Sequence, residues 1–330
     1  MAEFNFRVIS SKKIIDNLSL FRDKKVCAMV KANAYGFGLE AIVELVKPYV
    51  EYFGVANIDE ALQVRKLAPD SKVLIVGKTY DSALCRDNNI SFAVCNVADA
   101  LYAVRGSHVH IKLDSGMHRL GFNNAEELKT AVEILKEKDV DIEGVYTHFA
   151  TLDCDDEYFQ FQRDNFRKLL SQLPKDISPL IHVGGSWALS KELPEADMIR
   201  IGKGLYYGAI SIVSRIIRVF NVEPGDRVGY ANSFIAKRKM KIGIVPIGYA
   251  DGLKRCLANR YHVRIGSQQC KIVGNICMDM FAVDITGVNA FEGTQVCVLY
   301  DEASLAKMLK TSSYEVSTNF NHLRGRTIIK

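Results

Sequence analysis

A regular alternation of short apolar runs with segments of helical spacing most constrains how this chain folds, and it fills residues 28–201. The apolar runs have the composition of strands that are buried on both faces. They are Ala28–Lys31, Tyr52–Ala56, Val73–Val76, Ser91–Cys95, Val109–Leu113, Ile142–Thr147, Leu180–Val183 and Met198–Ile201. Amphipathic segments such as Ile58–Leu67, Ala125–Lys138 and Glu157–Leu173 lie between most of them, as expected of helices that cover a sheet.

Eight strands alternating with helices are what a closed (β/α)8 barrel requires, so the pattern predicts an α/β barrel domain over residues 8–214. A doubly wound sheet is the alternative, but no G-x-G-x-x-G follows the first strand. In a barrel, functional side chains belong at the carboxyl ends of the strands. The residues at those positions are Lys31, Tyr35, Lys112, Asp114, Arg119, His148, Ser186, Arg200 and Gly202. Each is unremarkable singly, but their concentration at one rim indicates an active site.

The pattern changes after Ser214, where short β-branched segments alternate with glycine turns. Pro224-Gly225-Asp226 is a turn between the first two segments. The others are Met240–Ile247, His262–Ile265, Cys270–Val273, Phe281–Ile285 and Gln295–Leu299. We therefore predict a C-terminal, mainly antiparallel β-domain over residues 215–330, a small barrel or sandwich in type, with the extreme N-terminus as a candidate to pack on it.

Composition excludes several classes of protein. The chain has 330 residues, 48% hydrophobic and 25% charged, which suits a globular protein of one large or two medium domains. Its net charge of +5 is interspersed, so we expect no nucleic-acid partner. Met1–Ser10 lacks the apolar region of a signal peptide and no run reaches membrane-spanning length, so we expect a cytoplasmic protein without a membrane partner.

Eight cysteines show no C-x-x-C pairing. They are Cys27, Cys85, Cys95, Cys154, Cys256, Cys270, Cys277 and Cys297. In a cytosolic chain of this size we expect buried free thiols, neither disulfides nor a zinc site, and we expect no metal elsewhere.

Lys31 follows the apolar run that begins at Val26, in V-C-A-M-V-K-A-N-A-Y-G-F-G. Apolar walls around an amine disfavour the ammonium form and make it a better nucleophile or base. By position alone, a solvated lysine at a strand end is the more common arrangement. The whole string decides against it, because Lys31-Ala-Asn-Ala-Tyr35-Gly36 resembles the pyridoxal-phosphate lysine motif of alanine racemases.

Four strings in the second domain are similar to further blocks of alanine racemases, in the order and rough spacing of that family. They are V-G-Y-A-N-S-F (Tyr230), P-I-G-Y-A-D-G (Tyr249), V-G-N-I-C-M-D-M (Met278 and Asp279) and Ser313-Tyr314-Glu315-Val316. On physical grounds alone, such tyrosines and aspartates are more often turn or surface residues. The resemblance nevertheless extends over about Val26–Val316, nearly the whole chain.

The resemblance implies a homodimeric alanine racemase that uses pyridoxal 5'-phosphate and supplies D-alanine for peptidoglycan. Lys31 would carry the cofactor as an aldimine and act as the base for D-alanine, and Tyr230 of a partner subunit as the base for L-alanine. In such a scheme one base removes the α-proton from one face and the other returns it to the opposite face. A phenol titrates at about pH 10 and needs cationic neighbours to act at neutral pH, for which His148 and Arg200 are the implied candidates.

The remaining roles follow from the same resemblance. Arg200 would face the pyridine nitrogen, and its permanent charge would leave that nitrogen unprotonated and disfavour transamination. The implied phosphate binders are Tyr35, Ser186, Gly202, Tyr314 and the backbone of Lys203, a composition that ordinary βα turns also have. Arg119 and the Met278 N–H would bind the substrate carboxylate. Supporting residues would be His148, Tyr249, Asp279 and Lys112, which is carbamylated in many family members.

Three departures from the family pattern concern the phosphate site and domain packing. Gly185 stands where asparagine is common, residues 202–208 are one residue longer than usual, and Leu323-Arg324-Gly325-Arg326 replaces an arginine-valine-proline-arginine ending. Alternatives are a serine or broad-specificity racemase on the same scaffold, or a non-catalytic pyridoxal-phosphate carrier. Such carriers lack a second domain, which argues against the last.

Overall fold

The computed structural model describes residues 3–152, 154–185, 193 and 195–330. It divides into two compact units, each described here by itself. The barrel unit consists of Ile14–Ala34 and Ile42–Tyr207, and the sheet unit of Met1–Lys13, Tyr35–Ala41 and Gly208–Lys330. The boundary between residues 214 and 215 expected from the sequence stays a proposal.

In the described part of the barrel unit, eight parallel strands close into a barrel, each paired with the next in sequence and the last with the first. The strands are β2 (Lys25–Met29), β3 (Tyr52–Val55), β4 (Lys72–Ile75), β5 (Ile90–Val94), β6 (His108–Lys112), β7 (Asp141–His148), β8 (Leu180–Gly184) and β9 (Met198–Ile201). All eight predicted strands are confirmed, and closure is direct, since Cys27 of β2 pairs with Arg200 of β9.

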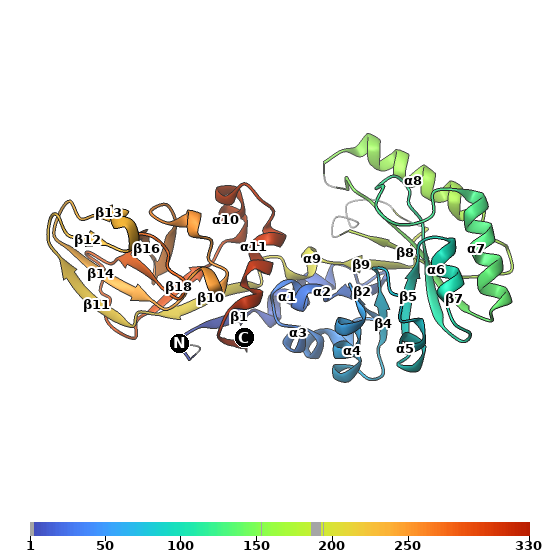
Figure 1. Cartoon of the computed structure of the whole chain (residues 1–330), viewed down its shortest axis with the longest axis horizontal. Helices are drawn as coiled ribbons and strands as arrows, with labels where there is room; N and C mark the ends of the chain where they lie inside the picture. Colours follow the sequence, from blue (N-terminus) through green and yellow to red (C-terminus); the bar gives the residue numbers. More distant parts are fainter. Residues whose placement is uncertain (1–2, 153, 186–192, 194) are drawn as a thin grey trace. The chain divides into compact units, whose positions relative to one another are not determined.

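Helices surround the barrel strands (Figure 1). They are α4 (Ile58–Leu67), α5 (Ser82–Asp87), α6 (Val97–Tyr102), α7 (Ala125–Glu137), α8 (Asp156–Leu170) and α9 (Lys203–Tyr206), with η1 (Lys47–Tyr49); α1 (Ser11–Ser19) and α3 (Leu39–Val46) come earlier in the chain. Four of them begin where an asparagine or aspartate accepts a hydrogen bond from the first turn, namely Asn57, Asn96, Asn124 and Asp155. These caps satisfy amides that would otherwise lack a partner, and they favour the start of each helix at that residue.

The turn α2 (Lys31–Tyr35) is left-handed. Ala32, Asn33, Ala34 and Tyr35 have φ values of 53°, 53°, 52° and 55°. Each non-glycine residue in this conformation costs about 1–2 kcal/mol. The first peptide of the turn is held by Glu60, whose Oε1 accepts from Ala32 N at 2.7 Å while Oε2 accepts from Ala56 N at 2.8 Å. Strain that persists directly after Lys31 marks this strand end as a functional position.

The described strands of the sheet unit form one nine-stranded sheet, in the order β11-β14-β17-β16-β15-β18-β10-β1-β19, and a separate pair β12-β13. The strands are β1 (Phe6–Ile9), β10 (Ile210–Arg215), β11 (Arg218–Val222), β12 (Arg227–Val228), β13 (Phe234–Ile235), β14 (Met240–Val245), β15 (His262–Ile265), β16 (Gln268–Val273), β17 (Phe281–Asp284), β18 (Gln295–Leu299) and β19 (Arg326–Ile329). Pairing is antiparallel except between β1 and β19. A mainly antiparallel C-terminal domain is therefore confirmed.

Short helices complete the sheet unit. They are η3 (Tyr230–Asn232), η4 (Tyr249–Asp251), η5 (Arg255–Leu257), α10 (Glu302–Leu309), α11 (Ser313–Asn319) and η6 (Phe320–His322). One apolar cluster, which includes Val222, Met240, Ile242 and Val273, holds β11, β14 and β16 together. Burying such side chains provides most of the favourable free energy of folding.

Two further observations concern the chain as a whole. All eight cysteines are free, and four of them are buried. Cys277 and Cys297 are only partly buried, and Cys154 and Cys256 are exposed, so the expectation of burial is wrong for the exposed pair. Cys154 lies in the polar connection before α8 and Cys256 in the short helix η5, and neither belongs to an apolar periodic segment that would indicate burial. None of the helices among the described residues combines the length and the continuous apolar character needed to cross a membrane.

Candidate active site

Four cationic or basic side chains meet at the carboxyl-terminal rim of the barrel. Lys31 follows β2, Lys112 ends β6, His148 ends β7 and Arg200 lies in β9. Burial lowers the pKa of Lys31, and the nearby charges of Arg119 and Arg200 lower it further. The desolvated amine expected from the sequence is therefore present, and it has more of the neutral, nucleophilic form than an ordinary lysine.

Lys112 lies beside the same charges. Burial, followed by repulsion from Arg119 and Arg200, lowers its pKa to about 8, and its Nζ lies 5.8 Å from the centre of the Tyr146 ring. A substantial fraction of this amine is neutral near neutral pH, which is the form that reacts with carbon dioxide.

Arg119 is carried by a loop that one carboxylate organises. Asp114 Oδ1 accepts from the backbone N–H groups of Gly116 and His118, each at 3.0 Å, and Oδ2 accepts from Arg119 N at 3.1 Å. Three hydrogen bonds to one ionised acceptor hold the loop in a defined shape. Asp114, placed at the rim by the sequence, thus positions Arg119.

The Arg200 guanidinium is buried and its orientation is set from several sides. Nη2 donates to Thr147 O at 2.7 Å, Nη1 contacts His182 Nδ1 at 2.9 Å, and the group stacks 4.4 Å from the centre of the Tyr146 ring. A Cβ atom at Gly184 would lie 2.5 Å from Nη2 and 2.3 Å from His148 Nδ1. Glycine is therefore required at the end of β8 for Arg200 to occupy this place.

Behind Arg200 a chain of hydrogen bonds runs along the barrel interior. His182 Nε2 lies 2.8 Å from His110 Nδ1, and His110 Nε2 lies 3.2 Å from Glu143 Oε2. Arginine can only donate and an ionised carboxylate can only accept. Each histidine must therefore carry its proton on Nε2, and every bond points from Arg200 towards Glu143.

The sequence analysis did not predict this series of hydrogen bonds. Burial lowers the pKa of His110 and His182, so both are neutral, while bonds from His110, Lys72 and Ser91 keep the pKa of Glu143 low despite burial. The only hint in the sequence was one histidine inside each of two predicted apolar strands. A contact between these histidines could be inferred only once β6 and β8 were known to point both side chains into the barrel.

His148 has cationic neighbours. Burial and the neighbouring charges of Arg200, Arg119 and Lys112 lower its pKa to about 3. In the chain by itself, this shift favours the neutral imidazole at neutral pH. The roles expected of His148 and Arg200 beside a tyrosine base stay predictions.

Two of the expected phosphate ligands meet in the sheet unit. The rings of Tyr35 and Tyr314 lie with their centres 6.0 Å apart and their planes at 45°. Tyr35 is buried and Tyr314 is exposed. In the barrel unit, Gly202 immediately precedes α9, and Lys203, its first residue, is buried. Ser186 lies outside the described residues.

Three further candidates project from turns of the sheet unit. Tyr230 in η3 is 71% exposed, Met278 is 53% exposed and Tyr249 in η4 is 45% exposed. Tyr230 is followed by Ala231 and Asn232 with φ values of 57° and 50°. Of the three candidates, only Tyr230 adjoins a turn with strained non-glycine backbone, and the functional roles expected of all three stay predictions.

The donor set of the rim fits a phosphorylated aldehyde cofactor. In the barrel unit, the Lys31 amine can form a covalent bond to the aldehyde, Arg200 is a permanent cation for the ring, and the backbone of the Gly202 turn suits a phosphate. The fold and these side chains define a two-domain protein whose (β/α)8 barrel holds a desolvated lysine, suited to bind an aldehyde, directly after its first strand.

The particular family follows from comparison. The family described as "Alanine racemase, N-terminal domain" matches residues 9–209, and "Alanine racemase, C-terminal domain" matches residues 209–328. The chain belongs to the alanine racemase family, whose cofactor is pyridoxal phosphate.

Individual relatives agree with this. An alanine racemase of Geobacillus stearothermophilus is 32% identical, over 94% of this chain and 89% of the relative. The crystal structure of an alanine racemase from E. faecalis superposes with a TM-score of 0.91 at 27% identity, covering 99% of this chain and 98% of the other. A histidine racemase from Leuconostoc mesenteroides has a TM-score of 0.91 at 24% identity, over 99% and 98%, and shares the fold.

Proposed function

We propose that this protein is an isomerase that interconverts L- and D-alanine with pyridoxal 5'-phosphate. The observation that carries the proposal is Lys31, a desolvated amine directly after β2 and before a strained turn, in a chain that belongs to the alanine racemase family. The bound cofactor would withdraw electrons from the amino acid and make its α-proton acidic. The protein's task is then to hold the substrate and to place one base on each face.

The test is direct. Purified protein loaded with the cofactor and incubated with L-alanine should yield D-alanine by chiral chromatography, and D-alanine should yield L-alanine. In deuterated water, the product should carry deuterium at the α-carbon, because the returning proton comes from a second base in contact with solvent. If the α-proton of neither enantiomer exchanged with the solvent, the proposal would be overturned.

Each base has a defined origin in this proposal. Lys31 would hold the cofactor and move the proton on one face, and Tyr230 of the partner subunit would do so on the other. Arg119 and the Met278 N–H would bind the substrate carboxylate. Exposure of Tyr230, Tyr249 and Met278 in the single chain supports a homodimer with shared active sites, because each would gain a partner there.

Arg200 would lie against the pyridine nitrogen as a permanent cation. Its two bonds to His182 and its bond to Thr147 O hold the guanidinium in one orientation. Because His182 accepts from Arg200 at Nδ1, it cannot also give a proton to the ring nitrogen through that atom. This arrangement supports racemisation over transamination.

A second candidate function differs in its substrate range. A histidine racemase shares this fold, so the fold alone does not select alanine. A broad-specificity or serine racemase is therefore the alternative, and parallel incubations with alanine, serine and histidine discriminate them. We further infer a cytoplasmic enzyme that supplies D-alanine for peptidoglycan, on the strength of the family resemblance.

Carbamylation of Lys112 is expected to follow pH. With a pKa of about 8, Lys112 should have about a hundredfold more neutral amine at pH 8 than an ordinary lysine. At a constant concentration of bicarbonate, whose reaction with the neutral amine releases water and no net proton, the carbamate should increase as pH rises to about 8 and level off above it. Carbon-13 NMR in labelled bicarbonate should show a carbamate resonance that disappears in Lys112→Ala and persists in Lys129→Ala, an exposed control. A resonance insensitive to the first substitution would refute the assignment.

A further inference from the structure

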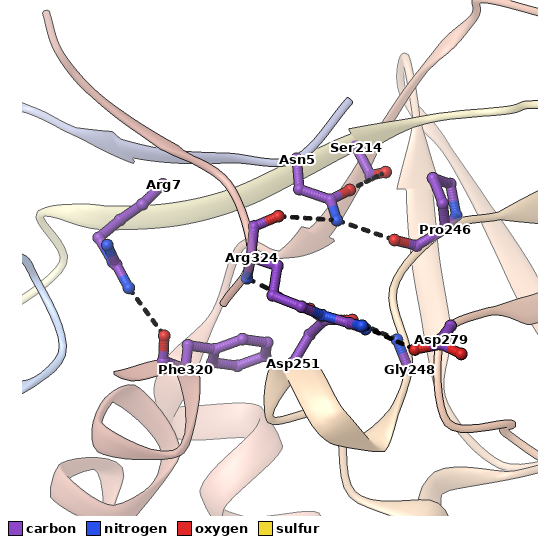
Figure 2. Close-up of polar contacts among 9 residues, drawn as sticks. All are labelled: Asn5, Arg7, Ser214, Pro246, Gly248, Asp251, Asp279, Phe320 and Arg324. Carbon is purple, nitrogen blue, oxygen red and sulfur yellow. Dashed lines mark hydrogen bonds and ion pairs between the residues drawn. The ribbon is translucent and has the colours of Figure 1, made fainter. Parts of the chain in front are cut away.

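Arg324, in the C-terminal segment after η6, joins two loops of the sheet unit through their carboxylates (Figure 2). Nε and Nη2 donate to the two oxygens of Asp251 at 2.8 Å and 2.9 Å, and Nη1 donates to Asp279 Oδ1 at 2.7 Å. A paired, planar contact of this kind specifies geometry as well as charge. These two ion pairs form a clamp, defined here as Arg324, Asp251 and Asp279.

Asp251 is the buried centre of the clamp. Its side chain is 0% exposed, and it also accepts from Gly248 N at 3.0 Å and from Arg324 N at 3.2 Å. A buried carboxylate is tolerated only when donors surround it. Asp279, by contrast, is partly exposed and contacts Arg324 from the other side. Of the two ion pairs in the clamp, the fold therefore needs the one with Asp251 and can lose the one with Asp279.

The two loops also contact each other directly. Tyr249 N donates to Cys277 O at 3.0 Å, and Ala250 N donates to Met278 O at 3.1 Å. A Cβ atom at Gly248 would lie 2.1 Å from Met278 O, so no side chain fits between the loops there. The backbone of Met278 is consequently fixed on one side by η4 and on the other by the neighbouring Asp279.

The segment that carries Arg324 is itself anchored to the sheet. Asn5 Nδ2 donates to Pro246 O at 2.8 Å and to Arg324 O at 3.4 Å, while its Oδ1 accepts from Ser214 Oγ at 2.7 Å (Figure 2). Asn5 O accepts from Arg326 N at 3.0 Å. One asparagine thus ties the first strand, the loop after β14 and the chain terminus together, and Arg324 reaches the loops from a rigid base.

We propose that Arg324 is a positioning residue that, through Asp279 and Asp251, sets the Met278 N–H to receive the substrate carboxylate. The inference rests on the proposed function, since it names Met278 as a substrate contact. Arg324 touches no substrate and acts through the loops.

The test uses Asp279→Asn, which removes the charge of the carboxylate in the dispensable ion pair with almost no change of shape and leaves the Asp251 pair intact. KM for alanine should rise about five- to tenfold with kcat changed less than about twofold, because the carboxylate is held in both the ground and transition states. Inhibition by propionate, a carboxylate without an amino group, should weaken by the same factor. The cofactor spectrum should stay the same.

Arg324→Lys should raise KM similarly, since one ammonium does not reproduce the planar contact with both carboxylates. Arg326→Met is the matched control, an exposed arginine of the same segment, and should leave KM unchanged. Hydrogen exchange of the peptide that contains Tyr249 and Ala250 should accelerate in Asp279→Asn and not in the control.

The outcomes separate the two claims. If the unmodified protein racemises alanine and Asp279→Asn changes neither KM nor propionate inhibition, the positioning role is wrong, whatever the exchange result. If the unmodified protein does not racemise alanine, the proposed function fails. Faster exchange in Asp279→Asn would then still establish the clamp as a structural device, without a substrate role, and the inference would be overturned.

Discussion

Lys31→Ala is expected to abolish racemisation, with a loss of at least about a thousandfold, since a general base alone contributes up to about four orders of magnitude and the covalent attachment is lost as well. Burial and the charges of Arg119 and Arg200 lower the pKa of Lys31, so its amine reacts readily with an aldehyde. Borohydride reduction of the loaded protein, followed by peptide mass spectrometry, should find the cofactor on the peptide that contains Lys31.

Lys25→Ala is the matched control, because Lys25 begins the same strand at the opposite rim and is exposed. It should keep both activity and cofactor attachment. Reduction that labels a lysine other than Lys31, or an active Lys31→Ala variant, would contradict the assignment.

Mixing Lys31→Ala with Tyr230→Phe should restore activity that neither variant has alone. If each active site takes Lys31 from one subunit and Tyr230 from the other, a mixed dimer holds one doubly damaged site and one intact site. With random exchange of chains, half of the dimers are mixed and half of their sites are intact, so activity should reach roughly one quarter of that of the unmodified protein. The observation behind this expectation is the 71% exposure of Tyr230 in the single chain.

Exchange of subunits must be measured independently, for example by mass spectrometry of differently tagged chains. Mixed dimers that form and remain inactive would show that both bases come from one chain. Mixing Lys31→Ala with Lys31→Ala carrying the other tag is the control, and it should restore nothing.

Local pattern was sufficient for most elements. The limits of Ile58–Leu67, Met198–Ile201, His262–Ile265 and Gln295–Leu299 agree with those of α4, β9, β15 and β18, because apolar periodicity and turn residues are properties of neighbouring positions. Asn57 illustrates the same point, since a cap acts on amides within its own turn. The rim positions of Lys31 and Arg200 followed once the strand ends were known.

Other features depended on residues far apart in the chain. Strand β1 pairs with β10 and with β19, so segments from both ends of the chain belong to one sheet. The residues of a short segment do not indicate which distant strand it pairs with. The left-handed turn α2 was equally hidden, because local preference disfavours it and only its surroundings hold it.

The sequence by itself determined the barrel, the antiparallel domain and the position of Lys31 at a strand end, since each depends on spacing along the chain and on residue type. Only the tertiary structure decided the state of the groups around them. Burial and nearby cations lower the pKa of His148, Glu143 lies at the end of a series of hydrogen bonds that starts at Arg200, and Arg324 pairs with Asp251 and Asp279. Protonation and hydrogen bonding depend on burial and on charges a few ångströms away, and those distances exist only after the strands have come together.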